Sequence, residues 1–154
     1  MLYELNLHWH GPRLDHSRQN TAMHPHTVLI ADDDRLLRES LSDVLISWGC
    51  TTHQVGTGGS AIDVLRSQPC DLLLSDIDMP DMSGFELLSW VHEHPTVPHT
   101  PASARGWQLP VVLMSARADR ELGRVALGAG AMVLLSKPVE IGRLSTLVHQ
   151  LFDR

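Results

Sequence analysis

Four short apolar runs and one weaker, β-branched stretch alternate along the chain with five stretches in which apolar residues recur at helical spacing. The runs occupy residues 28–31, 72–74, 110–116 and 132–135, and their shortness predicts strands. The weaker stretch at 50–55 predicts a strand at the edge of the sheet. The stretches at 36–45, 61–65, 85–91, 122–127 and 141–151 carry apolar residues three or four positions apart, which indicates helices. A strand followed by a helix, five times over, predicts an α/β fold with a doubly wound, five-stranded parallel sheet covered on both faces.

Residues with distinctive chemistry follow or end four of the predicted strands. They are Asp32 and Asp33 after the first, Asp76 after the third, Ser115 in the fourth and Lys137 after the fifth. The carboxyl ends of parallel strands lie at one edge of the sheet, where open α/β folds bind their ligands. We therefore expect these side chains to converge on one polar site.

The first predicted strand runs into three consecutive acids, Asp32, Asp33 and Asp34. Adjacent carboxylates repel one another, so the cluster indicates a divalent cation among them. The alternative without a metal is that Asp34 caps the next helix and another acid is simply solvated. Together with Asp76, the carboxylates of Asp32 and Asp33 would suit Mg²⁺, which prefers an octahedral shell of oxygen ligands.

With its negative charge screened in this way, Asp76 would be able to attack a phosphoryl group. Carboxylates do serve as nucleophiles that become aspartyl phosphates. The ammonium of Lys137 and the hydroxyl of Ser115 would stabilise the phosphoryl oxygens, over which the transition-state charge spreads. The chemistry predicted for this edge is phosphoryl transfer to Asp76.

Four motifs occur in a fixed order at the ends of the predicted strands. They are the acidic pair after the first strand, Asp-x-x-Met-Pro-x-Met-x-Gly from Asp76 to Gly84, Ser115-Ala116 and Lys137-Pro138. In this order and spacing, residues 27–152 resemble the receiver domain of two-component response regulators. The resemblance implies a flavodoxin-like (βα)5 receiver fold and a place in a phosphorelay.

The resemblance also implies a role for each motif residue. Asp76 would be the phosphoacceptor, Asp32 and Asp33 the acidic pair for Mg²⁺, Ser115 the switch hydroxyl, Lys137 the phosphate partner and Asp78 the donor of a backbone carbonyl to the metal. Phosphorylation would switch protein–protein contacts. The only chemistry expected is transfer to and from the protein's own aspartate, so an enzyme acting on a separate substrate is not expected.

The partners implied by the resemblance are a sensor histidine kinase or phosphotransfer protein and a downstream protein of unknown identity. Homodimers through the last helix and its neighbours occur in the family, and no seam in this sequence favours one. Because no output domain follows Arg154, we expect a stand-alone receiver that signals by protein contact.

Two features depart from the family pattern. Receiver domains usually carry an aromatic residue three positions before the lysine, where this chain has Leu134. The switch is therefore expected to run through backbone movement of the fourth helix and fifth strand, or to be weak. A Pro-rich insertion at 94–109 is the other departure, and it is either a solvated loop or a segment whose Trp107 anchors a partner.

Two other functions remain open from the sequence. Asp76-Ile-Asp78 fits the Asp-x-Asp of haloacid-dehalogenase phosphatases, although that interpretation leaves Asp32 and Asp33 without a role. A receiver that serves as a scaffold and never accepts phosphate is the second alternative. Turnover of phosphate esters would favour the phosphatase, and lack of any Mg²⁺-dependent response would favour the scaffold.

Residues 1–26 form a polar extension that we expect to be mobile, because they show no periodic apolar face. The extension carries His8, His10, His16, His24 and His26. A metal bound by its His-x-His pairs is the alternative, and the alternation of Leu5, Leu7 and Trp9 allows a short strand or docking segment.

Composition narrows the setting of the protein. A length of 154 residues predicts one domain, and a net charge of -6 with pI near 5.9 argues against a nucleic-acid surface. Cys50 and Cys70 have no metal-ligand spacing and are expected to be buried free thiols in a reducing cytoplasm. The sequence shows no apolar run of membrane-spanning length and no signal peptide, so no membrane partner is expected.

Overall fold

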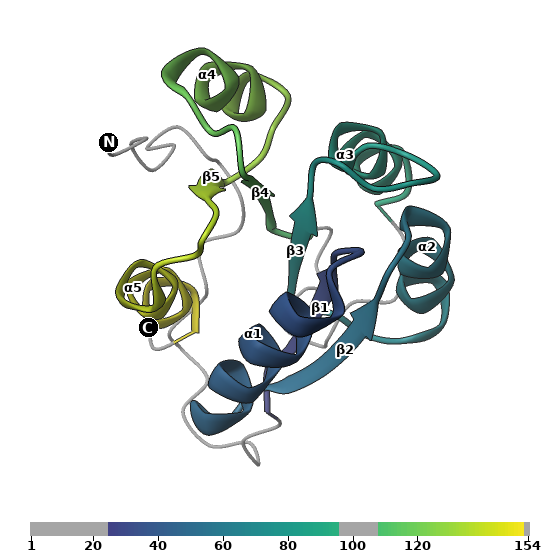
Figure 1. Ribbon diagram of the computed structural model, residues 1–154. Helices are drawn as coiled ribbons and strands as arrows, with labels where there is room; N and C mark the ends of the chain where they lie inside the picture. The colour runs from purple at the N-terminus through teal and green to yellow at the C-terminus, as the bar shows by residue number, and fades with distance from the viewer. Residues whose placement is uncertain (1–24, 96–107, 153–154) are drawn as a thin grey trace, which may run out of the picture.

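The computed structural model describes residues 25–95 and 108–152, which form a five-stranded sheet flanked by helices (Figure 1). The strands are β1 (Thr27–Ala31), β2 (Thr51–Val55), β3 (Leu72–Asp76), β4 (Val111–Ser115) and β5 (Val133–Ser136). They are all parallel and lie in the order β2-β1-β3-β4-β5. This is the strand order of flavodoxin-like folds, and it confirms the predicted doubly wound α/β sheet.

One helix follows each strand, as the alternation predicted. The helices are α1 (Arg35–Ser47), α2 (Gly58–Ser67), α3 (Gly84–Glu93), α4 (Arg120–Gly128) and α5 (Ile141–Phe152). Buried residues of α1 and α5 pack on one face of the sheet, and those of α2, α3 and α4 pack on the other (Figure 1). Each face therefore has its own apolar core layer.

The contrast between β3 and β2 follows from their places in the sheet. All five residues of β3 are buried, because this central strand is covered on both faces and sends Leu73 into one core and Leu72 and Leu74 into the other. The sequence of β2 is Thr-Thr-His-Gln-Val, with none of its residues fully buried. The prediction that this strand lies at the sheet edge is confirmed.

Helices α1 and α3 each begin at a residue whose side chain caps them. The side chain of Asp34 accepts a hydrogen bond from the backbone N–H of Leu37 at 3.2 Å and so caps α1. Ser83 caps α3 in a capping box with Glu86. The cap by Asp34 is the alternative that the sequence left open, and it removes this acid from the set that faces the site.

Gly84, the first residue of α3, is required by a close backbone approach. A Cβ at this position would lie 2.5 Å from the carbonyl oxygen of Asp76, so only glycine fits. Its own N–H donates to the carbonyl of Ile77 at 2.8 Å. The glycine of the Asp76–Gly84 motif therefore lets α3 begin directly against the end of β3.

Three apolar residues that helped to place the helices are more exposed than their spacing suggested. Leu36 is 75% exposed, Val125 52% and Ile141 46%. Leu36 lies nine positions before the buried Leu45, which at about 3.6 residues per turn is on the opposite side of α1. The apolar pattern located the helices correctly but did not distinguish these exposed apolar residues from the buried ones.

The predicted N-terminal extension and Pro-rich insertion fall mostly outside the described residues, and so does Trp107. His26 is described, and its ring stacks on that of Phe152 with 4.0 Å between centroids. Cys70 is buried and Cys50 half-buried; burial raises the pKa of the Cys70 thiol to about 12. Among the described helices, none combines the length and the apolar character needed to cross a bilayer.

Candidate functional site at the carboxyl edge of the sheet

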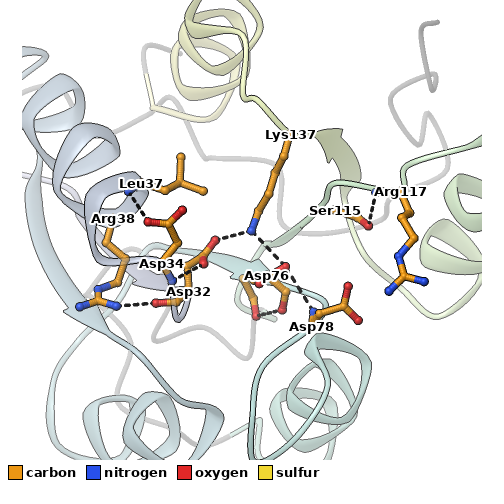
Figure 2. Close-up of polar contacts among 10 residues, drawn as sticks. Asp32, Asp34, Leu37, Arg38, Asp76, Asp78, Ser115, Arg117 and Lys137 are labelled. Atoms are coloured by element: carbon orange, nitrogen blue, oxygen red, sulfur yellow. Dashed lines mark hydrogen bonds and ion pairs between the residues drawn. The ribbon is translucent and has the colours of Figure 1, made fainter.

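The residues predicted to converge do meet at the carboxyl edge of the sheet. Ala31 pairs with Ser75, and Asp76 with Met114, so β1, β3 and β4 end nearly level. Carboxylate oxygens of Asp32, Asp33 and Asp76 lie within 4.8 Å of one another. Lys137, immediately after β5, points into this group (Figure 2).

Lys137 forms an ion pair with two of the acids at once. Its Nζ lies 2.7 Å from Oδ2 of Asp32 and 3.2 Å from Oδ1 of Asp76 (Figure 2). Lys137 is the only lysine in the sequence. Burial would lower its pKa, but the hydrogen bonds and charges of Asp32 and Asp76 outweigh burial and raise it. Lys137 is therefore a fixed ammonium at neutral pH.

Asp76 is a carboxylate in an unfavourable setting. It is buried, and desolvation together with the nearby charge of Asp32 raises its pKa, against the opposing effect of Lys137. Its Oδ1 also accepts a hydrogen bond from the backbone N–H of Asp78 at 3.2 Å. The negative charge of Asp76 is therefore only partly compensated, and an added cation would stabilise its ionised form.

Asp32 is held more firmly than any other acid of the site. Its side chain is fully buried, with Oδ1 accepting from the N–H of Asp34 at 2.9 Å. Its backbone N–H donates to the carbonyl of Val55 at 3.1 Å. Asp33, by contrast, is exposed, and no hydrogen bond holds its carboxylate within the described residues. The acidic pair thus has one rigid member and one that faces solvent.

Ser115 ends β4 beside the acids but is engaged elsewhere. Its Oγ accepts a hydrogen bond from the backbone N–H of Arg117 at 3.1 Å, and its carbonyl accepts from the N–H of Lys137 at 2.9 Å. Within the described residues its hydroxyl makes no hydrogen bond to Asp76 or Lys137 (Figure 2). Ser115 therefore lies at the carboxyl end of the strand beside β3, with its hydroxyl bound to the loop that follows β4.

The donor set fits a hard divalent cation. Three carboxylates meet with one ammonium, which leaves net negative charge, and oxygen ligands are those that Mg²⁺ and Ca²⁺ prefer. Asp34 is not among the ligands because it caps α1. Asp32, Asp33 and Asp76 are thus the residues able to hold a metal here.

Two further residues near the site were not anticipated from the sequence. Arg38 donates from Nη1 to the carbonyl oxygen of Asp32 at 2.6 Å. Asp81 accepts from the backbone N–H groups of Gly58 and Gly59 at 2.9 and 2.8 Å, which ties the loop after β3 to the start of α2. In the sequence, Arg38 is distinguished only as a cation on the apolar side of α1. No sequence pattern marks Asp81.

Leu134 lies where the family pattern places an aromatic residue. It is fully buried in the core layer that β5 shares with α2, α3 and α4. A buried leucine on this layer has no ring that could rotate between an outward and an inward position. At this position the chain therefore has a buried core residue in place of an aromatic ring.

Comparisons with known proteins agree with this geometry. Residues 28–149 match the family model described as response regulator receiver domain. The response regulator protein FleR of Pseudomonas aeruginosa is 36% identical over 121 residues, which are 79% of this chain and 23% of FleR. An uncharacterized 14.6 kDa protein of Leptolyngbya boryana is 33% identical over 80% of this chain and 87% of its own length.

Solved structures show the same fold. A putative response regulator from Chloroflexus aurantiacus matches 85% of this chain and 100% of its own, with 29% identity and a TM-score of 0.71. The chain spans about a quarter of the length of the first curated relatives that it matches. What those longer proteins do as a whole is therefore a separate question from what residues 28–149 do.

Proposed function

The chain belongs to the response regulator receiver domain family, and from this premise we propose that Asp76 accepts a phosphoryl group in a Mg²⁺-dependent reaction. Membership makes it a receiver domain of two-component systems, a family of phosphoacceptor signalling domains. It gives no support to the haloacid-dehalogenase interpretation of Asp76 and Asp78. The proposed chemistry is transfer to and from Asp76 alone, without turnover of a separate substrate.

Mg²⁺ would be held by the carboxylates of Asp32, Asp33 and Asp76 and by the backbone carbonyl of Asp78. Support comes from the carboxylate oxygens of the three acids, which lie within 4.8 Å of one another. When bound, the metal supplies positive charge that screens the acids from one another and from an incoming phosphoryl group. Asp34 is excluded from this set by its role as the cap of α1.

In the transfer, an oxygen of Asp76 forms a bond to phosphorus while the bond from phosphorus to the donor breaks. The leaving nitrogen or oxygen of the donor takes the bonding electron pair. Lys137 already reaches Asp76 at 3.2 Å and would bind a phosphoryl oxygen as the charge spreads over it. Ser115 would exchange its hydrogen bond from the N–H of Arg117 for one to the phosphoryl group.

Release of Ser115 from Arg117 gives a route from phosphorylation to the protein surface. The phosphoryl group adds about -1.5 to -2 charge, and its pull on Ser115 and Lys137 acts on the ends of β4 and β5. With Leu134 in place of the family's aromatic residue, we propose that the switch moves the backbone around α4 and β5 and thereby changes protein–protein contacts.

The proposed phosphoryl donor is a sensor histidine kinase or a phosphotransfer protein, as family membership implies. The downstream partner is proposed to be a protein. We propose that this function is cytoplasmic, because a free cysteine such as Cys70 fits a reducing compartment. NtrC of Escherichia coli, a DNA-binding transcriptional regulator, matches this chain over only 24% of its length.

The observation that carries the proposal is the sharing of one ammonium, that of Lys137, by two buried acids at the carboxyl ends of β1 and β3. Its test is a phosphate-affinity gel of the full chain after incubation with acetyl phosphate. We expect one retarded band with Mg²⁺, no retarded band with chelator, and none for Asp76→Asn. Asp71→Asn, an acid at the opposite edge of the sheet, is the control and should shift as the wild type does.

Three results would contradict the proposal. Retardation of Asp76→Asn would place the phosphoryl group elsewhere. Sustained release of phosphate from an ester would revive the phosphatase interpretation. Absence of a band in the wild type, together with no response to Mg²⁺, would favour a scaffold that is never phosphorylated.

A further inference from the structure

Asp32 is fixed at four atoms, and one of these contacts comes from a charged side chain that has no role in the proposed chemistry. The N–H of Asp32 donates to Val55, Oδ1 accepts from the N–H of Asp34, and Oδ2 faces Lys137. The fourth contact is to the carbonyl oxygen, which accepts from Nη1 of Arg38 at 2.6 Å (Figure 2). Arg38 therefore grips the peptide group that joins Asp32 to Asp33.

The chain leaves space for this contact. Arg38 lies one turn into α1, with its own N–H donating to the carbonyl of Asp34 at 3.0 Å, and its side chain turns back toward the end of β1. A Cβ at Gly56 would lie 3.4 Å from Nη1 of Arg38 and 4.0 Å from the carbonyl oxygen of Asp32. Both distances are ordinary van der Waals contacts, so the guanidinium lies directly beside Gly56 without being crowded there.

The contact also comes at a cost, which indicates that it does more than fill space. The Nε of Arg38 is buried and has no hydrogen-bond partner within the described residues, and an unsatisfied buried donor is unfavourable. An exposed Arg38 would avoid this cost altogether. Its neighbour Arg35 does so, being 79% exposed and paired with Glu39 at 2.8 Å.

The two cations beside Asp32 differ in what they occupy. Lys137 takes a carboxylate oxygen, Oδ2, and so leaves one carboxylate oxygen fewer for a metal. Arg38 takes the main-chain carbonyl and leaves both carboxylate oxygens to other partners. It can remain in place when a cation binds, while its charge reduces the repulsion among the acids.

We propose that Arg38 is a positioning residue for the divalent cation: it fixes the Asp32–Asp33 peptide group so that the exposed carboxylate of Asp33 is directed toward Asp32 and Asp76. No hydrogen bond within the described residues orients the Asp33 side chain, so its direction depends on this backbone. The proposal rests on the function proposed above, because it assumes that a divalent cation is bound at these acids.

The test compares Arg38→Met with Arg35→Met in the full chain. Arg35→Met removes a cation from the same helix three positions away and is the matched control. Two readouts are needed: calorimetric titration with Mg²⁺ alone, and initial rates of Asp76 phosphorylation by acetyl phosphate across Mg²⁺ concentrations. Substitution of a residue that orients metal ligands typically lowers metal affinity about 10- to 100-fold.

We expect Arg38→Met to weaken Mg²⁺ binding about tenfold and to leave the rate at saturating Mg²⁺ near that of the wild type. Arg38→Lys keeps the charge with a different geometry, so its Mg²⁺ affinity should lie between those of Arg38→Met and the wild type. Arg35→Met should bind Mg²⁺ as the wild type does. An unchanged Mg²⁺ affinity in Arg38→Met, even with a lower Tm, would overturn the proposal and leave Arg38 a purely structural role.

Arg38→Lys decides the question if Arg38→Met does not fold, because it keeps the charge but cannot reproduce the contact of Nη1 with the carbonyl oxygen of Asp32. Unchanged Mg²⁺ affinity in Arg38→Lys would then overturn the proposal. If the wild type binds Mg²⁺ but forms no Asp76 adduct, the proposed function fails while calorimetry still decides the role of Arg38. If the wild type binds no Mg²⁺, both proposals fail.

Discussion

The two edges of the sheet use aspartate in opposite ways. At the amino edge, Asp71 precedes β3, and its Oδ2 accepts from the N–H of Thr27 at 2.8 Å with the ring of His26 at 3.9 Å. At the carboxyl edge, Asp76 ends the same strand and faces Asp32 with one shared ammonium between them. Asp71 satisfies a backbone N–H group, whereas Asp76 shares the ammonium of Lys137 with a second carboxylate.

This difference separates an acid that stabilises the fold from an acid that belongs to the candidate functional site. An acid that accepts a backbone N–H contributes to stability in the usual way. An acid whose pKa is raised by burial and by a neighbouring carboxylate reduces stability when it ionises. Folds keep such groups mainly at functional sites, so the carboxyl edge is where we expect substitutions to alter activity more than folding.

The largest effect on activity short of removing Asp76 is expected at Lys137. Lys137→Met removes the only ammonium among the acids, and loss of one group that stabilises transition-state charge typically slows a reaction about 100-fold or more. We expect this loss in the time course of the Asp76 adduct at saturating Mg²⁺. Arg124→Met, an exposed cation on α4, is the control. Equal rates for Lys137→Met and the wild type would remove Lys137 from the mechanism.

The opposite pattern is expected at the amino edge. Asp71→Ala leaves the N–H of Thr27 without its acceptor, which should lower the free energy of unfolding by about 1–3 kcal/mol while the adduct still forms at the wild-type rate. Urea unfolding measures the first and the gel assay the second. Asp63→Ala, an exposed acid on α2, should stay within about 0.5 kcal/mol of the wild type. A slower reaction in Asp71→Ala would break the separation of the two edges.

Asp76→Asn should stabilise the protein at neutral pH in the absence of Mg²⁺. The folded pKa of Asp76 lies above its ordinary value of 3.8, so the folded state holds the proton to higher pH than the unfolded state does. Stability is therefore lost as pH rises from about 4 through the folded pKa. Melting curves should show the variant above the wild type at pH 7, with the gap narrowing toward pH 4.

Added Mg²⁺ sharpens the same comparison, because a cation that binds only the folded state raises its stability. The wild type should gain more in Tm from Mg²⁺ than Asp76→Asn does. A variant that melts below the wild type at pH 7 without Mg²⁺ would show that Asp76 is stabilising as it stands.

The smallest effect is expected at Asp81, an exposed acid that resembles Asp71 in its bonding although it lies near the carboxyl edge. The N–H groups of Gly59 and Gly58 lower its pKa, so its ionised form adds stability above pH 3.8, and that stability is lost as pH falls through the folded pKa. Asp81→Asn should therefore be slightly less stable at pH 7 and equal to the wild type in strong acid. A difference that does not change with pH would refute this origin.

The sequence predicted the sheet and the convergence of its polar residues because both follow from short-range pattern and from the geometry of parallel strands. Asp32, Asp76 and Lys137 meet because each follows or ends a strand. The alternative role for Asp34, as a helix cap, is also confirmed. The functional roles assigned to the site residues in metal binding, phosphoryl transfer and switching stay predictions: Asp32, Asp33, Asp76, Asp78, Ser115 and Lys137.

What the sequence could not predict are contacts that leave no periodic signal. Arg38 reaches a main-chain carbonyl, and any residue type at 32 would offer the same acceptor. Asp81 binds backbone groups 22 and 23 positions away, a partner that only the packing of α2 beside the loop determines. The exposure of Leu36 was not predicted either, because an apolar residue helps to locate a helix without showing that its own side chain is buried.

The central claim is that the acids of the carboxyl edge gather a divalent cation so that Asp76 can take a phosphoryl group. The most direct test is mass spectrometry of the intact full chain after acetyl phosphate, followed by peptide mapping. The account predicts one phosphoryl group per chain, in the peptide that contains Asp76, and only when Mg²⁺ is present. A phosphoryl group on another residue, such as one of the histidines, or one that forms equally well with chelator, would contradict it.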